Sequence, residues 1–345
     1  MIPAYLALGS NLGDRKATLN AAVAALGETP EIVVRAVSSY HETAPVGGPG
    51  GQGTFLNAAV AIETLFDPTD LLRRLHAIEA EAGRVRTVRW GERPLDLDLL
   101  LYSDAVIDQP DLTIPHPRMA VRRFVLTPLA EIAPDVVDPL TRRTIVELIE
   151  NLDREPRFLC LIGMPLAVFR RVAETLNAVG LHEPIRSRES YVDTALDHPL
   201  DFFAVLDQKA REFDASRWSA EIWGDRWMMS NFWPGLMAID VSTRLKETDL
   251  ESWRDHYRES EPRIVRPTFV AASPVSYRHL RRWTDKNRAA TLGGSELPLL
   301  CPGYTDPLGF IDRCLKTPQL YAPPEPARHD TIVAEILAAC ASIQG

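Results

Sequence analysis

A short stretch near residue 95 alternates leucine with aspartate and so constrains both the backbone and its chemistry. Every odd position from Leu95 to Leu101 is leucine, and Asp96 and Asp98 stand between the first three of these leucines. Successive side chains of a strand point to opposite faces, so the pattern predicts a strand with both carboxylates on one face. The two carboxylates would lie about 6.5–7 Å apart along the strand, close enough to hold one or two hard cations.

Cationic and aromatic residues directly precede this strand. They are Arg84, Arg86, Arg89, Trp90 and Arg93. Guanidinium groups are planar forks that match phosphate oxygens. An Asp-x-Asp pair at a strand edge and an arginine-rich loop are each more often solvated surface. Because the two are joined in one stretch, they favour a site for a magnesium-bound nucleotide.

The length and charge of the chain limit what surrounds such a site. At 345 residues the chain exceeds the usual size of a single domain, so two domains are expected. Apolar residues make up 46% and charged residues 25%, which are ordinary globular values. The net charge of -9 argues against a broad nucleic-acid-binding face, so a basic site must be local, as in residues 84–93.

Cysteine usage and hydropathy indicate a cytoplasmic protein. The four cysteines, Cys160, Cys301, Cys314 and Cys340, form no Cys-x-x-Cys pair and are expected to be free thiols in a reducing compartment. The N-terminus shows no charged leader, and no run reaches about 18 apolar residues. We therefore expect no membrane association.

The first part of the chain has the periodicity of an α+β fold. Strands are expected at 4–9, 32–43, 55–64 and 95–102, with helices after Asp14 and after Asp67-Pro68, an apolar segment at 124–132 and a last helix at 144–152. The order βαββαβ predicts a ferredoxin-like sandwich, with an antiparallel-rich sheet and helices on one face. A charged, proline-containing segment at 151–157 marks the boundary between domains 1–155 and 156–345.

Residues 1–150 resemble hydroxymethyldihydropterin pyrophosphokinase, an enzyme of the folate pathway. The matching motifs are Leu8-Gly9-Ser10-Asn11-Leu12-Gly13, Thr43-Ala44-Pro45, Phe55-Leu56-Asn57-Ala58, Ile78-Glu79 with Gly83-Arg84, Arg89-Trp90-Gly91-Glu92-Arg93-Pro94-Leu95-Asp96-Leu97-Asp98, and Pro115-His116-Pro117 with Arg122 and Phe124. This combination is specific, because it fixes several chemically different residues at set intervals.

The resemblance implies an activity and a set of site residues. Such enzymes transfer pyrophosphate from MgATP to 6-hydroxymethyl-7,8-dihydropterin and release AMP, by alignment and charge neutralisation. Two Mg²⁺ would bind Asp96 and Asp98, and the implied catalytic residues are Arg84, Arg93, Asp96 and Asp98. The implied ATP-binding residues are His76, Glu79, Arg84, Arg86, Arg89, Trp90, Arg93, Leu99, Leu112, Thr113, His116 and Arg122. The implied pterin-binding residues are Thr43, Ala44, Pro45, Val46, Phe55, Asn57, Trp90, Asp96 and Phe124.

Some positions depart from the family pattern. Phe55 stands where tyrosine is common, His76 where glutamine is common, and Pro117 follows the histidine. The loop between Arg86 and Arg89 is one residue shorter than in some members. These differences bear on nucleotide affinity and loop closure and leave the metal ligands unchanged.

The second half of the chain weakly resembles deoxynucleoside kinases over residues 157–343. The strand 158–162 ends at Gly163, as in P-loop kinases, and a parallel α/β sheet is expected. A working loop needs G-x-x-x-x-G-K-[ST], but Val168, Phe169 and Arg170 occupy the last three places. We therefore expect a degenerate domain that no longer transfers phosphate. Dimerisation, scaffolding and ligand sensing remain open roles, and a homodimer would form through this domain.

Two alternative functions remain open at this point. Ferredoxin-like sandwiches also bind RNA or partner proteins, in which case exposed aromatics and basic surroundings are expected rather than paired acids. The second half could be an active nucleoside kinase with a phosphate site rebuilt around Arg170 and Arg171.

Overall fold

The structure is a computed structural model, and it divides the chain into two compact units. It describes residues 1–46, 50–84, 91–109, 111–141, 143–155, 157–162, 164–181, 199–214, 217, 224, 226–231, 247–260, 268–272, 299–302 and 328–344. One unit holds Met1–Leu152 together with the last residues of the chain from Leu337 onward, and the other holds Asp153–Ile336. Each unit is described by itself.

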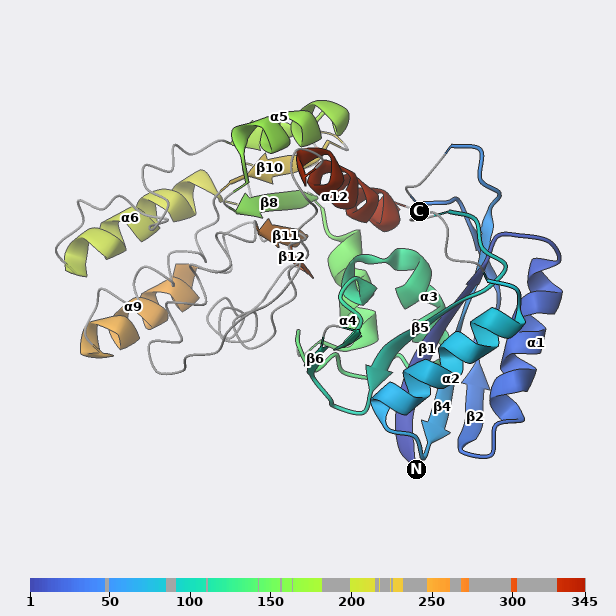
Figure 1. Ribbon diagram of the computed structural model, residues 1–345. Coiled ribbons are helices and arrows are strands. Elements are labelled where there is room, and N and C mark those ends of the chain that lie inside the picture. Colours follow the sequence, from blue (N-terminus) through green and yellow to red (C-terminus); the bar gives the residue numbers. More distant parts are fainter. Residues whose placement is uncertain are drawn as a thin grey trace. The chain divides into compact units, whose positions relative to one another are not determined.

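The first unit is built on an antiparallel sheet. Its strands are β1 (Ile2–Ser10), β2 (Ile32–Val37), β3 (His41–Thr43), β4 (Phe55–Thr64) and β5 (Asp96–Tyr102). The strand order is β2-β4-β1-β5, and β3 pairs with the start of β4. Neighbouring strands are antiparallel throughout. β1 lies between β4 and β5, as Figure 1 shows. The order of elements confirms the expected antiparallel sheet with helices.

Two helices cover one face of this sheet and close the core. They are α1 (Arg15–Gly27) and α2 (Pro68–Glu81). Asp14 caps α1 by accepting a bond from the Ala17 N–H at 2.9 Å, and Asp67 caps α2 ahead of Pro68. The fully buried Leu6 of β1 and Val60 of β4 pack with Leu19 of α1 in the same core. This arrangement fixes which face of β5 is left for polar residues.

The opposite face of the sheet is also covered, which the sequence analysis did not predict. Helix α3 (Arg123–Ile132) contacts β4, β1 and β3. Ala59 is fully buried, although it points away from Ala58 and Val60, its neighbours on β4. The expectation of helices on one face is therefore wrong for α3. Its apolar residues, predicted only as an apolar segment, form a helix that contains Pro128.

Shorter elements complete the first unit. They are the hairpin strands β6 (Ile107–Gln109) and β7 (Leu112–Ile114), the 3₁₀ turn η1 (Met119–Val121) and helix α4 (Ile145–Asp153). The loop that leads from β7 into α3 returns to β5, because the His116 N–H donates to the Leu100 carbonyl oxygen at 2.9 Å. This bond brings His116 and Arg122 to the polar end of β5.

The second unit contains a mixed sheet that is mostly parallel. Its described elements are β8 (Phe158–Ile162), α5 (Leu166–Thr175), β9 (Val179–Leu181), α6 (Pro199–Glu212), β10 (Met228–Ser230), α9 (Glu247–Ser260), β11 (Phe269–Ala272) and β12 (Leu299–Pro302). Helix α12 (Arg328–Gln344) follows, and its residues from Leu337 onward belong to the first unit. The strand order is β12-β11-β8-β10-β9, and β12 alone pairs in the antiparallel sense. Within the described residues, no helix is long and apolar enough to cross a membrane.

Buried side chains in the later part of the chain agree in part with the sequence-based expectations. Cys160 and Cys340 are buried free thiols, and burial raises the pKa of each above its usual range. Trp227 is buried. The tryptophans near it in the sequence, Trp218, Trp223 and Trp233, lie outside the described residues, as does Cys314.

Candidate active site

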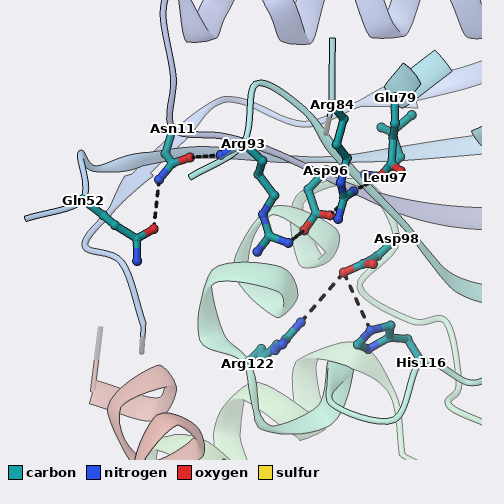
Figure 2. Close-up of polar contacts among 10 residues, drawn as sticks. All are labelled: Asn11, Gln52, Glu79, Arg84, Arg93, Asp96, Leu97, Asp98, His116 and Arg122. Atoms are coloured by element: carbon teal, nitrogen blue, oxygen red, sulfur yellow. Dashed lines mark hydrogen bonds and ion pairs between the residues drawn. The ribbon is translucent and has the colours of Figure 1, made fainter. Parts of the chain in front are cut away.

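The predicted pair of acids lies at the start of β5. Asp96 and Asp98 are paired across from Gly9 and Ala7 of β1, and Leu97 and Leu99 between and beyond them point into the core. The two carboxylates therefore share the face away from α1 and α2. Their side chains are 20% and 33% exposed, so both carboxylates remain accessible to a ligand. Figure 2 shows cationic side chains converging on them.

Asp96 is held by two arginines. Arg84 Nη1 donates to its Oδ1 at 2.6 Å, and Arg93 Nη1 lies 3.2 Å from its Oδ2. Burial raises the pKa of the Asp96 carboxyl, and the charge of Asp98 raises it further. The guanidinium groups of Arg93 and Arg84 oppose both effects. The arginines thus favour the ionised carboxylate that a metal ion requires.

Glu79 of α2 contacts both Arg84 and the backbone of β5. Its side chain is buried, and its Oε1 accepts a bond from the Leu97 N–H at 2.8 Å and another from Arg84 Nη1. Leu97 is the residue between the two acids, so Glu79 fixes the backbone of β5 at that point. Glu79 was predicted to bind ATP. That assignment stays a prediction, and the contacts of Glu79 are with Arg84 and with the strand that carries the acids.

Asp98 faces Arg122 and His116. His116 Nε2 lies 3.7 Å and Arg122 Nη1 lies 3.8 Å from Asp98 Oδ2. Both distances exceed hydrogen-bonding range. Arg122 therefore offsets the charge of the Asp98 carboxylate without forming a hydrogen bond to it. This leaves Asp98 the freer of the two acids to accept a cation.

His116 is a neutral donor. The Arg118 N–H donates to His116 Nδ1 at 3.2 Å, so the ring proton is assigned to Nε2, the atom that faces Asp98. Burial and the charges of Arg122 and Arg118 lower the pKa of His116 to about 3. Burial likewise lowers the pKa of Arg122 to about 10, and Arg122 remains charged at neutral pH. The site thus presents one neutral and three charged donors.

Asn57, a predicted pterin-binding residue, lies across β1 from Asp96, because both pair with Gly9. Asn57 of β4 is buried, and its Nδ2 donates to Thr43 Oγ1 at 2.8 Å. Phe55 is half-buried with the Arg93 guanidinium 5.8 Å from its ring centre, and Arg122 lies 5.5 Å from the ring centre of Phe124. Neither ring belongs to the buried core, so both remain available to a flat ligand.

Asn11 is a residue whose role the sequence analysis missed. Its Oδ1 accepts from the Arg93 N–H at 2.9 Å, and its own N–H donates to the Arg93 carbonyl oxygen at 3.3 Å. Its Nδ2 also donates to Gln52 Oε1 at 3.3 Å (Figure 2). Asn11 was noted only within the Leu8–Gly13 motif. The only signal for its role was its place there, because the bonds join segments about 40 and 80 residues away.

The remaining predicted residues are placed less closely. Leu99 and Leu112 have core side chains, so only their backbone groups could meet a nucleotide. His76 is exposed on α2, and Thr113 is half-buried on β7. Ala44, Pro45 and Val46 follow β3 without a strand of their own. Arg86, Arg89 and Trp90 lie in 85–90, outside the described residues.

The donor set fits magnesium. Mg²⁺ prefers oxygen ligands and is usually held by one or two carboxylates together with water and substrate phosphates. Asp96 and Asp98 supply such carboxylates on one face. Among the described residues, no group of three or more histidines, cysteines or acids forms a metal cage of its own.

Removal of the Glu79 side chain should lower the stability of the protein. We expect Glu79→Ala to lower the free energy of unfolding by about 3 kcal/mol or more, because Arg84 and the Leu97 N–H lose a buried acceptor. Glu81→Ala is the matched control: the Glu81 side chain is 63% exposed in its ion pair with Arg74, and we expect a change within about 0.5 kcal/mol. Urea unfolding measures both. Equal losses would contradict the anchoring role of Glu79.

His116 should make the stability of the metal-free protein depend on pH. Its folded pKa of about 3 lies below the unfolded value of about 6.5. Between these values the unfolded chain binds a proton that the folded protein does not, so stability falls as the pH falls from about 6.5 toward 3. Relative to His116→Gln, the wild type should lose about 1 kcal/mol between pH 7.5 and 5.5, measured by urea unfolding. The control His76→Gln alters an exposed residue. A wild-type difference from His116→Gln that stays constant with pH would refute this.

The chain matches known proteins over its first part. The family described as 7,8-dihydro-6-hydroxymethylpterin-pyrophosphokinase matches residues 5–134. Curated proteins named 2-amino-4-hydroxy-6-hydroxymethyldihydropteridine pyrophosphokinase are similar to it. The one from Bacillus subtilis is 51% identical over 133 residues, which cover 39% of this chain and 79% of the relative. The one from Synechocystis is 45% identical over 150 residues, covering 44% and 76%. The one from Pseudomonas aeruginosa is 44% identical over 157 residues, covering 44% and 96%.

A solved structure also matches, but distantly. Wild-type HPPK-DHPS of Plasmodium falciparum with pteroate is 14% identical, with a TM-score of 0.36, and the match covers 61% of this chain and 62% of that one. A likeness this low supports no conclusion. The curated relatives decide the matter, because the chain covers more than two thirds of each at 44–51% identity. The chain therefore belongs to the 7,8-dihydro-6-hydroxymethylpterin-pyrophosphokinase family.

Proposed function

We propose that the first domain transfers pyrophosphate from MgATP to the hydroxymethyl group of 6-hydroxymethyl-7,8-dihydropterin, with Asp96 and Asp98 as the metal ligands. Family membership makes the chain a 2-amino-4-hydroxy-6-hydroxymethyldihydropteridine pyrophosphokinase of folate biosynthesis. The proposal assigns the parts of that reaction to residues. It rests on one observation: two carboxylates share one face of β5 and are met there by three arginines and a neutral histidine.

The acids carry the metal-binding part of the proposal. Asp96 and Asp98 would hold two Mg²⁺ together with oxygens of the triphosphate. Magnesium bound there would neutralise phosphate charge and align the reacting groups. The pterin alcohol oxygen then bonds to the β-phosphorus while the bond from that phosphorus to the α–β bridging oxygen breaks, which leaves AMP.

The cationic residues would hold the triphosphate in line. Arg84 donates to Asp96 and Arg93 forms an ion pair with it, so both would meet phosphate oxygens that approach that acid. Arg122 and the Nε2–H of His116 lie beside Asp98 in the same way, where they too would meet phosphate oxygens. Such donors stabilise the charge that builds on the bridging oxygen as the bond breaks. Arg86, Arg89 and Trp90 are assigned to the ATP side on the family resemblance, as are His76, Leu99, Leu112 and Thr113.

The aromatic residues would hold the pterin. Phe55 and Phe124 are half-buried rings on the side of the acids, and offset stacking adds about 0.5–1.5 kcal/mol per aromatic pair. Asn57 is fixed by Thr43 and can read the amide-like edge of the ring. The backbone of residues 43–46 follows directly and would read the rest of that edge.

We infer that the second unit is a degenerate deoxynucleoside-kinase-like domain without phosphoryl-transfer activity. Its strands β8, β9, β10 and β11 are parallel, with β8 inside the sheet. Val168 and Phe169 stand at the places of the second glycine and the lysine of a P-loop, and both are buried in α5. Buried apolar side chains cannot cradle phosphate. Homodimerisation through this unit and a cytoplasmic location belong to the same proposal.

Loss of either acid should abolish turnover. We expect Asp96→Asn and Asp98→Asn to lower kcat by at least about 10³-fold, because the ligand charge that holds the metal is removed. Asp104→Asn, an exposed acid in the turn after β5, is the matched control and should leave kcat unchanged. The assay follows AMP and pterin diphosphate from MgATP and the pterin. Release of ADP alone by the wild type would exclude pyrophosphate transfer.

The second unit should be silent in a nucleoside-kinase assay. The full chain carrying Asp98→Asn is incubated with MgATP and each of the four deoxynucleosides, and no deoxynucleoside monophosphate is expected. Phosphorylation of any of them would overturn the inactive assignment. Arg170→Ala in the same background would then test whether a rebuilt phosphate site uses that arginine.

A further inference from the structure

The residue between the two halves of the proposed site is a glycine. Gly9 of β1 pairs with Asn57 of β4 on one side and with Asp96 of β5 on the other. The three residues form one row across adjacent strands, and side chains in such a row project from the same face. The row thus runs from a proposed pterin-binding side chain to a metal-binding one. Between them lies bare backbone.

The backbone of Gly9 does not itself require glycine. Its φ lies outside the left-handed region, where a side chain would be strained. Glycine inside a strand weakens the strand by about 0.5–1 kcal/mol relative to alanine. Glycine in such a place often marks a close approach of a ligand or another chain segment. Local folding alone therefore does not account for glycine at position 9.

A side chain at position 9 would stand among the residues of the site. A Cβ there would lie 3.3 Å from Asn57 Oδ1, 3.8 Å from Phe55 Cδ1 and 3.9 Å from Asp96 Cβ. The last two distances are ordinary van der Waals contacts. The first is tight, so the Asn57 side chain would have to shift slightly. Asn57 is held by its bond to Thr43 Oγ1 at 2.8 Å. An added methyl group would thus fit the fold but occupy the space above the strand, between the aromatic ring and the acid.

We propose that Gly9 is a specificity-determining residue whose bare backbone lets the pterin ring lie close to β1, with its hydroxymethyl group directed from Phe55 and Asn57 toward Asp96. The inference rests on the proposed function, because it assigns the pterin to that side of the acids. A flat heterocycle can pass over a glycine at van der Waals distance and cannot do so over a side chain. The nucleotide is held by the arginines and does not cross this point.

The test compares Gly9→Ala with the wild type in the full chain. The KM for the pterin should rise at least about tenfold, because overpacking of a tight contact costs this much binding. The Kd for MgATP, measured by calorimetry without pterin, should stay within about twofold, since no proposed ATP contact changes. Gly27→Ala is the matched control: a Cβ there meets only Val34 Cγ2 at 4.0 Å, and neither constant should change.

The outcomes separate this inference from the function on which it rests. Pyrophosphate transfer by the wild type supports the function whatever Gly9→Ala does. An unchanged pterin KM in Gly9→Ala, or an equal loss of MgATP affinity, would overturn the role of Gly9. If Gly9→Ala does not fold, an NMR measurement on the wild type tests the proposal instead. In its complex with pterin and a non-hydrolysable ATP analogue, a nuclear Overhauser effect is expected between the Gly9 Hα atoms and the hydroxymethyl protons. Its absence would refute the proposal.

Discussion

Repulsion between the carboxylates of Asp96 and Asp98 is the interaction that the rest of the site must offset. Burial of Asp96 disfavours its charge, and the neighbouring acid disfavours it further. Neutralisation of the acid by a proton would remove a metal ligand. The protein instead surrounds the pair with cations. Arg84, Arg93 and Arg122 offset the charges of Glu79, Asp96 and Asp98, and His116 stays neutral.

The sheet explains how such a group is held in place. β1 lies between β4 and β5, so one row of residues reaches from Asn57, on the proposed pterin side, to Asp96, on the proposed metal side. Asn11, two residues beyond Gly9, forms two hydrogen bonds with the backbone of Arg93. Glu79 holds the other side of β5 through Leu97. The acids are thus fixed by bonds to the backbone on both sides, which limits how far the repulsion can move them.

Local pattern predicted much of this fold, and through-space contacts explain what it missed. The alternation in 55–64 predicted β4 with its bounds, and Asp67-Pro68 predicted the start of α2, because both signals act over a few residues. The cover of the second sheet face by α3 was missed, since periodicity cannot say which face a helix meets. The same limit applies to Glu79. Its spacing placed it on α2, but only the structure shows that its carboxylate accepts the Leu97 N–H.

These ion pairs have a consequence for the proposed reaction. Asp96 and Asp98 place two carboxylates beside the proposed triphosphate site, and Arg84, Arg93 and Arg122 contact them. A triphosphate tail and two divalent cations offset each other, whereas the tail alone would add negative charge beside two carboxylates. Under the proposed function, bound cations would offset the charge of Asp96, so the arginines that contact it could turn toward phosphate oxygens. Arg84 has a second partner in the buried Glu79, which would keep it in place during this exchange. The same arginines would thereby oppose protonation of Asp96 and also carry phosphate charge.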